Sequence, residues 1–296
     1  VDFTVEVERS LRVLDGAVGV FCSVGGVQPQ SETVWRQANK YQVPRVAFVN
    51  KMDRMGANFE QVLAELKSKL KAPAVAVQLP IGAADTFSGV IDLVKMSAYR
   101  FSEEDMGSRV DQVEIPAELA AKAEEARAHL IETVADVDEI LLEAYMENSD
   151  VSENVIKEAI RRATIANQLI PVLAGSSLKN KGVQPLLDAV TDYLPSPLDI
   201  RAVRGLDPKT DVDVQREASD FEALTGLVFK MATDKFIGKL AFVRVYAGQL
   251  KKGQNIFNPR TKKRERIGRL LRLHANHREY HHSVLEFKNA ELYFGT

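Results

Sequence analysis

Apolar residues in the first 60 positions come in short, uninterrupted runs rather than in alternation. Residues 17–21 form one run, and residues 46–49, inside a predicted strand over 45–50, form another. Between them lie a turn-rich segment and a helical pattern from about Gln30 to Tyr41, which Pro29 opens. Short apolar runs of this kind are typical of strands that are buried on both faces. The pattern therefore predicts a parallel α/β sheet, whose ligands gather beyond the carboxyl ends of its strands.

The pattern changes after this first part and later returns. The predicted elements are a helix over 59–70, short strands over 74–101, a helix that starts near Pro116 and repeats to Leu141, a helix that Ser152 caps and that runs to about Asn167, a strand over 169–174 and a helix over 183–190. Because the buried-strand pattern resumes only at 169–174, we expect a sheet domain that is interrupted by an inserted α+β subdomain.

A second domain follows. Residues 194–197, Leu-Pro-Ser-Pro, end the last helix, and the polar run from there to Asp220 is interpreted as a linker. Beyond it, residues 227–231 and 240–246 are rich in β-branched and aromatic side chains and are bounded by glycine turns. These features predict a separate, mostly β domain.

Composition narrows the class of protein. The 296 residues are 45% hydrophobic and 27% charged, which fits two globular domains. No apolar run approaches the roughly 20 residues that cross a bilayer, and the first residues lack a signal-peptide pattern, so we expect a soluble, cytoplasmic protein with no membrane partner. The single cysteine, Cys22, cannot form an internal disulfide and is expected to be a core residue.

Charge is distributed unevenly along the chain. Residues 1–200 hold 20 basic and 30 acidic side chains, whereas residues 201–296 hold 19 and 11. Within them, residues 101–160 carry 17 acids against 4 bases, and residues 251–278 carry 10 bases against one acid. Each run can be a solvated face or a surface for a partner of opposite charge, so the two parts of the chain are expected to meet different partners.

The candidate chemistry begins directly after the second buried strand, with Asn50-Lys51-Met52-Asp53. An ionised Asp53 can accept both the ring N–H and the exocyclic amine of guanine, whereas adenine offers no such pair of donors on that edge. The Lys51 stem can lie along the flat base, and the Asn50 amide can tie this loop to a neighbouring one. A plain polar turn at a strand end is the alternative.

A second loop, Ser176-Ser177-Leu178, follows Gly175 at the end of the resumed strand and can border the same crevice. Small residues there let backbone N–H groups approach a carbonyl oxygen of a base. Alone, Gly-Ser-Ser is more often a strand-to-helix turn. Together, the two loops predict a guanine site.

The motifs closely resemble those of bacterial or organellar elongation factor G, from residue 1 to about Asn276. The resemblance rests on the segments Val1–Ser10, Gly25–Gln30, Phe48–Asn58 and Gly175–Val183. It implies a partial P-loop-type GTPase domain over 1–200 with an inserted subdomain over 72–168, and an all-β barrel domain over 206–296 that need not be complete. It also implies GTP or GDP as the ligand and assigns base binding to Asn50, Lys51, Met52 and Asp53 and to Ser176, Ser177 and Leu178.

Other features of that family are missing. The chain has no Gly-x-x-x-x-Gly-Lys-Ser/Thr loop, and Gly238-Lys239 is followed by Leu240. By the resemblance, the phosphate loop, the Mg²⁺ ligands and the water-positioning histidine would precede Val1. We therefore expect a GTP hydrolase by family, with no catalytic residue and no metal ligand in these 296 residues and no hydrolysis by them alone. His281 and His282 lack a third ligand, and the sequence departs from the family from about Arg278.

The resemblance also implies partners. Ribosomal RNA would meet the basic residues Lys251, Lys252, Arg260, Lys262, Lys263, Arg264, Arg266, Arg269 and Arg272. The acidic helices would face ribosomal stalk proteins, in a monomer that acts in GTP-dependent translocation of tRNA and mRNA in the cytoplasm or an organellar matrix. The alternatives are a ribosome-protection or release-type translational GTPase and a non-catalytic RNA-binding fragment.

Overall fold

The computed structural model describes residues 4–102, 107–148, 150–199, 202–207, 210–234, 238–274, 277–281, 283–284 and 289–293. The chain divides into two compact units. The first runs from Leu14 to Pro195, and the second combines Asp2–Val13 with Ser196–Thr296. Residues 4–13 therefore cluster with the second unit, although the sequence groups them with the GTPase domain.

A four-stranded parallel sheet forms the centre of the first unit. Its order is β1 (Ala17–Cys22), β2 (Arg45–Asn50), β8 (Ile170–Ala174) and β3 (Ala74–Ala76), and all neighbours are parallel. The interior strands are apolar on both faces because helices cover both, and Val46 and Val49 are fully buried. The predicted sheet, interrupted and then resumed, is confirmed.

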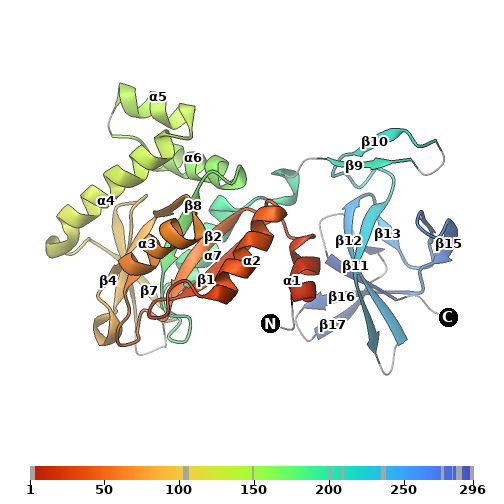
Figure 1. Cartoon of the computed structure of the whole chain (residues 1–296), viewed down its shortest axis with the longest axis horizontal. Coiled ribbons are helices and arrows are strands. Elements are labelled where there is room, and N and C mark those ends of the chain that lie inside the picture. The colour runs from red at the N-terminus through yellow and green to blue at the C-terminus, as the bar shows by residue number, and fades with distance from the viewer. Residues whose placement is uncertain are drawn as a thin grey trace. The chain divides into compact units, whose positions relative to one another are not determined.

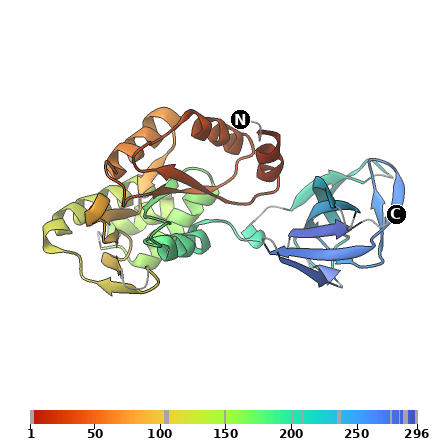
Figure 2. The same cartoon turned by 90° about the horizontal axis from the view of Figure 1, so that it is seen from below.

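Four helices cover this sheet: α2 (Pro29–Lys40), α3 (Phe59–Leu70), α6 (Glu153–Ile165) and α7 (Val183–Tyr193). Figures 1 and 2 show α2 and α3 on one face and α6 and α7 on the other. Proline suits the first helical turn because its missing N–H has no partner there, and α2 begins at Pro29 as predicted. Trp35 on α2 packs edge-on against Phe21 of β1, with ring centroids 5.8 Å apart.

The inserted subdomain combines an antiparallel sheet with helices. Its elements are β4 (Gln78–Ile81), the 3₁₀ turn η1 (Ala84–Thr86), β5 (Gly89–Asp92), β6 (Ser97–Phe101), β7 (Val110–Val113), α4 (Ala117–Ala135) and α5 (Glu139–Glu147). The insert was expected to begin near residue 72. Because β3 pairs with β8 in the parallel sheet, the antiparallel part begins only at Gln78.

The acidic helical segment differs from the sequence expectation, which carried one repeat to Leu141. The helix α4 ends at Ala135, and α5 begins at Glu139. The break occurs because Asp138 is the N-cap of α5: its side chain accepts a hydrogen bond from the backbone N–H of Leu141 at 2.9 Å. Ser152 occupies the N-cap position of α6, as predicted, but its side chain makes no capping hydrogen bond.

The second unit is rich in β structure. A helix, α1 (Thr4–Leu11), precedes its strands along the chain, and a short 3₁₀ turn, η2 (Pro197–Asp199), follows the first unit. The described strands form a five-stranded antiparallel sheet in the order β11 (Thr225–Asp234), β12 (Gly238–Ala247), β19 (Asn289–Tyr293), β16 (Arg269–His274) and β17 (His277–His281). Three two-stranded ribbons accompany it: β9 (Val203–Leu206) with β10 (Asp213–Arg216), β13 (Leu250–Lys251) with β18 (Ser283–Val284), and β14 (Asn255–Asn258) with β15 (Lys263–Arg266).

The polar stretch before Asp220 was expected to be a linker, and the structure corrects this. It holds the hairpin of β9 and β10, whose exposed side chains hide it from a search for apolar runs. Asp207 shapes the connection by accepting hydrogen bonds from the backbone N–H groups of Thr210 and Asp211. Among the helices that the structure describes, none is long and apolar enough to cross a membrane.

Candidate functional site

Three loops meet at the carboxyl edge of the parallel sheet. They follow β1, β2 and β8, which end side by side because the strands are parallel. The backbone N–H of Ser23 donates to the Asn50 carbonyl at 2.9 Å, and that of Gly175 donates to the Val49 carbonyl at 3.0 Å. The two sequence-predicted loops therefore lie at one edge, and a third loop, at Ser23, joins them.

Asn50 connects the two predicted loops through its side chain. Its Oδ1 accepts from the backbone N–H of Lys51 at 2.7 Å and from that of Ser177 at 2.9 Å. Its Nδ2 donates to the Ser177 hydroxyl at 2.9 Å. The predicted tie between the loops is confirmed, and both ends of the amide are in use.

Lys51 and Met52 are held by their backbones. Lys51 has a left-handed conformation, with φ of 67°, and its carbonyl accepts from the hydroxyl of the buried Ser23 at 2.7 Å. Met52 is 1% exposed and donates its backbone N–H to the Gly175 carbonyl at 3.1 Å. Burial of Met52 anchors the loop, while the exposed Lys51 stem is left free to cover a flat ligand.

Asp53 follows this anchored stretch and is half-buried. Among the residues that the structure describes, its carboxylate makes no hydrogen bond and no ion pair. A carboxylate accepts several hydrogen bonds when ionised. Asp53 therefore offers two carboxylate oxygens that can accept hydrogen bonds from a ligand.

The second loop is a tight hairpin between Ser176 and Lys181. The N–H of Ser176 donates to the Lys181 carbonyl at 2.8 Å, and the Lys181 N–H donates back at 3.0 Å. Ser177 donates its N–H to Asn50, so the backbone N–H groups of Ser176 and Ser177 both form hydrogen bonds within the protein. Within the described chain, the N–H groups of Leu178 and Lys179 have no partner, and Leu178 is 84% exposed.

Two glycines make this hairpin sterically feasible. A Cβ on Gly175 would lie 2.5 Å from the Lys181 carbonyl oxygen and 2.7 Å from the Phe48 ring. Gly182 has φ of 83°, where a side chain is strained, and its Cβ would lie 2.6 Å from the Ala174 carbonyl oxygen. The close approach of the loop to β2 and β8 therefore depends on both residues.

Ser23 and Lys181 are site residues that the sequence reasoning missed. Ser23 has a usable signal, because it is the first polar residue after the apolar stretch of β1, as Asn50 is after the apolar stretch of β2. Lys181 has no such signal in the sequence. A lysine in a polar loop is expected to be exposed, but Lys181 is only 6% exposed.

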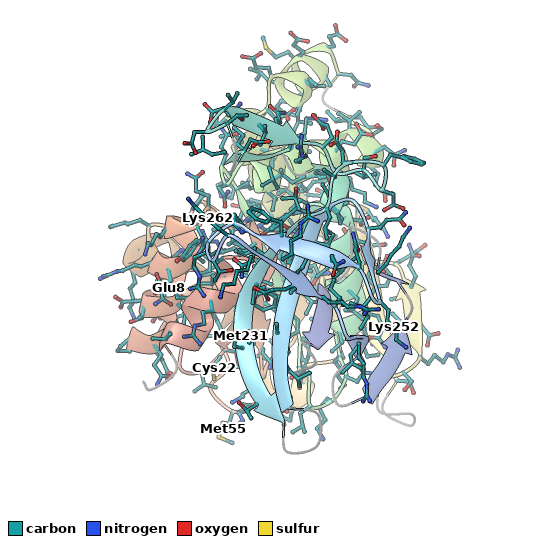
Figure 3. All side chains as sticks on the ribbon, turned by 90° about the vertical axis from the view of Figure 1, so that its right-hand side faces the viewer. Glu8, Cys22, Met55, Met231, Lys252 and Lys262 are labelled. Carbon is teal, nitrogen blue, oxygen red and sulfur yellow. The ribbon has the colours of Figure 1, made fainter. Side chains whose placement is uncertain are left out.

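Cys22, at the end of β1, is half-buried and not in the core, which corrects the expectation. Burial raises the pKa of its thiol, but backbone hydrogen bonds from Gly25 and Val24, together with the positive charges of Lys51 and Arg54, lower that pKa below its ordinary value. Figure 3 labels Cys22 together with Met55, which is 91% exposed. Because Cys22 of β1 is the register partner of Asn50 of β2, it lies at the same edge as the candidate site.

The basic residues of the second unit lie on β13 to β16 and the turns between them. Exposed side chains there are Lys251, Lys252, Arg260, Lys262, Lys263, Arg264, Arg266 and Arg269. Figure 3 shows Lys252 and Lys262 apart from each other, so the charge is spread over a face of this unit. The Arg272 side chain lies outside the described residues, as do those of His281 and His282. Glu265 is engaged within this face, because it accepts from Asn258 at 2.8 Å.

The residues present fit a base but not the phosphates or Mg²⁺ of a nucleotide. For a base, the site offers the acceptor oxygens of Asp53 and the backbone N–H groups of Leu178 and Lys179, which have no partner among the described residues. The printed sequence has no phosphate-binding glycine loop with its lysine. In the described part of the chain, no three His, Cys, Asp or Glu side chains gather in a way that could hold a metal ion.

A parallel sheet with an inserted subdomain, followed by a β-rich unit, is the architecture of the GTP-binding and second domains of a translational GTPase. The chain belongs to the family of the elongation factor Tu GTP-binding domain, whose family model matches residues 1–196. The model of elongation factor G domain 2 matches residues 223–284. The resemblance to elongation factor G is thereby confirmed.

One curated relative supports this family placement, and one solved structure supports the fold. Over 279 residues the chain is 56% identical to elongation factor G 2 of Desulfotalea psychrophila, an alignment that covers 94% of this chain and 40% of that protein. The chain thus spans less than half of that relative's length. A crystal structure of a Thermus thermophilus protein matches with a TM-score of 0.78 over 100% of this chain and 43% of that one. At 24% identity, this match shows the fold alone.

Proposed function

We propose that the chain binds the guanine base of GTP and GDP at the carboxyl edge of its parallel sheet. The observation that carries the proposal is the unpartnered carboxylate of Asp53, adjacent in sequence to Met52, whose backbone is bonded to Gly175 of the second loop. Asp53 accepts the ring N–H and the exocyclic amine of guanine. The Lys51 stem covers one face of the base, and the N–H groups of Leu178 and Lys179 are donors for its carbonyl oxygen.

Selectivity follows from the same arrangement. Adenine would leave the Asp53 carboxylate without donors in a partly buried site, and an unsatisfied charged group costs several times the worth of a neutral hydrogen bond. Discrimination of about 100-fold corresponds to roughly 3 kcal/mol, which two charge-assisted hydrogen bonds supply.

At the level of the whole protein, we propose elongation factor G activity, the GTP-dependent translocation of tRNA and mRNA on the ribosome. The family membership and the 56% identity to elongation factor G 2 support this proposal. Ribosomal stalk proteins are proposed partners of α4 and α5, whose exposed surface combines acidic side chains with Ile140, Leu142 and Met146. A ribosome-protection or release-type GTPase is the rival within the family.

The 296 residues by themselves are proposed not to hydrolyse GTP. Phosphoryl transfer depends on a phosphate cradle and bound Mg²⁺, and this chain supplies neither ligand set. Turnover of GTP by this purified chain on ribosomes, above a control with ribosomes alone, would disprove the proposal.

The base site is tested with guanosine, which needs no phosphate contacts. Amide chemical shifts of Ser177, Leu178 and Lys179 are followed by NMR while guanosine, adenosine or xanthosine is added. Guanosine should move these signals and adenosine should not, and Asp53→Asn should transfer the response to xanthosine. Asp188→Asn, which changes an exposed carboxylate on α7, is the matched control and should behave as wild type. Equal responses to guanosine and adenosine would reject guanine recognition.

The exposed basic face of the second unit favours a second proposed activity, binding of ribosomal RNA through phosphate contacts. Such contacts position a protein without reading sequence, and their strength falls steeply with salt. If RNA binding is the activity and there is no base site, the chain should bind ribosomal RNA, and Asp53→Asn should change neither this binding nor the response to guanosine.

A further inference from the structure

One turn of the inserted subdomain touches both loops of the candidate base site. The backbone N–H of Ala84, in η1, donates to the Met52 carbonyl at 2.8 Å. The carbonyl of Phe87, which ends the same turn, accepts from Nζ of Lys181 at 3.0 Å. Met52 belongs to the first loop and Lys181 to the second, so residues 82–87 bridge the two. We call these residues the insert turn.

The insert turn is itself well ordered by local bonds. Phe87 donates its N–H to the Ala84 carbonyl at 3.2 Å, and the Thr86 hydroxyl bonds to the Ala83 backbone. Gly82 has φ of 79°, and a Cβ there would lie 2.2 Å from the Thr86 carbonyl oxygen, so the tight turn requires glycine. A turn with this many internal bonds can transmit a displacement rather than absorb it.

The hydrogen bonds form a closed circuit. It passes from Met52 to Gly175, along the chain to Ser176, across the hairpin to Lys181, through Lys181 Nζ to Phe87, and through Ala84 back to Met52. Each connection has a length between 2.8 and 3.2 Å. A closed circuit holds the loops at one separation, because no single connection can lengthen without straining the others.

The burial of Lys181 shows that its ammonium group matters to this circuit. The residue is 6% exposed, beside the fully buried Phe87. Burying a charged group carries a desolvation cost that an apolar side chain of the same size would avoid. The cost is offset where the ammonium donates to fixed carbonyl oxygens, as it does to Phe87.

We propose that Lys181 is a positioning residue for guanine recognition, and that Lys181 and the insert turn hold the two base loops at the separation the base requires. This inference rests on the proposed guanine function. Its consequence is that the inserted subdomain sets guanine affinity, so a partner that displaces the insert turn would change how tightly the base is held.

Three variants of the full chain test the proposal. Lys181→Met keeps the side-chain stem and removes the ammonium. Lys67→Met, at an exposed lysine on α3 outside the base site, is the matched control. Thr86→Val removes the hydroxyl that bonds to the Ala83 backbone and loosens the insert turn without touching Lys181. The proposal can therefore still be tested if Lys181→Met does not fold.

Two readouts separate positioning from general stability. Guanosine affinity is measured by NMR titration, and amide hydrogen exchange is measured at Ser176 and Ala84, with Val46 in the sheet core as reference. Lys181→Met should weaken guanosine binding about tenfold, as expected for one hydrogen bond from a charged donor, and should speed exchange at Ser176 and Ala84 but not at Val46. Thr86→Val should show the same pattern with a smaller change, and Lys67→Met should match wild type.

The proposal is overturned if Lys181→Met binds guanosine like wild type, or if exchange rises equally at Val46, which would make Lys181 an ordinary core residue. If wild type itself gives no guanosine response, the proposed base site fails. Faster exchange confined to Ser176 and Ala84 in Lys181→Met would then still support the loop-ordering role, and unchanged exchange would overturn that as well.

Discussion

Asn50 and Ser177 lie 127 positions apart in the sequence and meet through two hydrogen bonds of 2.9 Å. One runs from the Ser177 backbone N–H to Asn50 Oδ1, and the other from Asn50 Nδ2 to the Ser177 hydroxyl. These bonds make one site from two loops, because they fix the end of β2 against the end of β8.

Asn50→Ala should therefore separate the loops. It removes both bonds to Ser177 and the bond to Lys51, and we expect a loss of about 2 kcal/mol in unfolding free energy and no guanosine response. Ser177→Ala, which keeps the backbone bond, should lose about 0.5 to 1 kcal/mol. Urea unfolding followed by fluorescence of Trp35, the chain's single tryptophan, reports on this unit. Equal effects of the two substitutions would contradict the assigned role of the backbone bond.

Gly175→Ala should disrupt the second loop by steric conflict. The added Cβ would meet the Lys181 carbonyl and the Phe48 ring, neither of which can withdraw easily, so we expect destabilisation of about 2 kcal/mol or more. Gly25→Ala is the control, because its Cβ would meet the movable end of the Gln28 side chain at 3.0 Å. The same unfolding assay applies, and a Gly175→Ala protein as stable as Gly25→Ala would contradict the close packing described.

Asp138 should make the stability of the first unit depend on pH in the acid range. Hydrogen bonds from Arg162, at 2.7 and 2.9 Å, lower the pKa of this carboxyl below its ordinary value of 3.8. A lowered pKa in the folded state gives stabilisation that is complete above the ordinary value and is lost as the pH falls below it toward the folded value.

Asp138→Asn should accordingly be less stable than wild type at pH 7, by about 1 to 2 kcal/mol for the lost charged pair with Arg162, since asparagine can still cap α5. The difference should shrink as the pH falls below about 4. Unfolding free energies of both proteins from about pH 7 to about pH 3 provide the measurement. Glu158→Gln, on a carboxylate that is 73% exposed and 3.7 Å from Arg162, should change little at any pH. A constant difference between Asp138→Asn and wild type would rule out the linkage.

Lys262 and Lys263 should contribute to binding of ribosomal RNA by pairing with its phosphates. Replacing both with Ala should weaken binding and reduce the slope of log affinity against log salt by about one for each phosphate that is no longer neutralised. Replacing Arg36 and Lys67, two exposed cations of the first unit, provides a control with the same change in net charge. Filter binding across a salt series distinguishes the two. If the pairs reduce the slope equally, the basic face has no special role.

The sheet domain and its first loop could be predicted from local sequence patterns. Residues 46–49 form a continuous apolar run because both faces of β2 are covered. The run at 17–21 was expected to be covered in the same way, but Val18 and Val20 are exposed on β1. After each run, a polar residue marks the strand end. The same rule finds Ser176 and Ser177 after β8. It would also have found Ser23 after β1.

Other features could not be predicted from such patterns. The break before Asp138 depends on a cap that competes with helix continuation, and the hairpin of β9 and β10 has too few buried residues to give a strand signal. The half-buried state of Cys22 depends on how the loop after β1 folds back, with Gly26 donating its N–H to the Cys22 carbonyl.

By itself, the sequence predicted the candidate base-reading residues, and it determined the interruption of the sheet domain and the charge of each part. Each of these depends on neighbouring residues or on the order of elements along the chain. Only the tertiary structure decided that Asn50 meets Ser177, that Asp53 has no partner among the residues the structure describes, and that the buried Lys181 joins the second loop to the insert turn. These are relationships between segments up to 127 positions apart, and packing in three dimensions, rather than local pattern, determines which of them form.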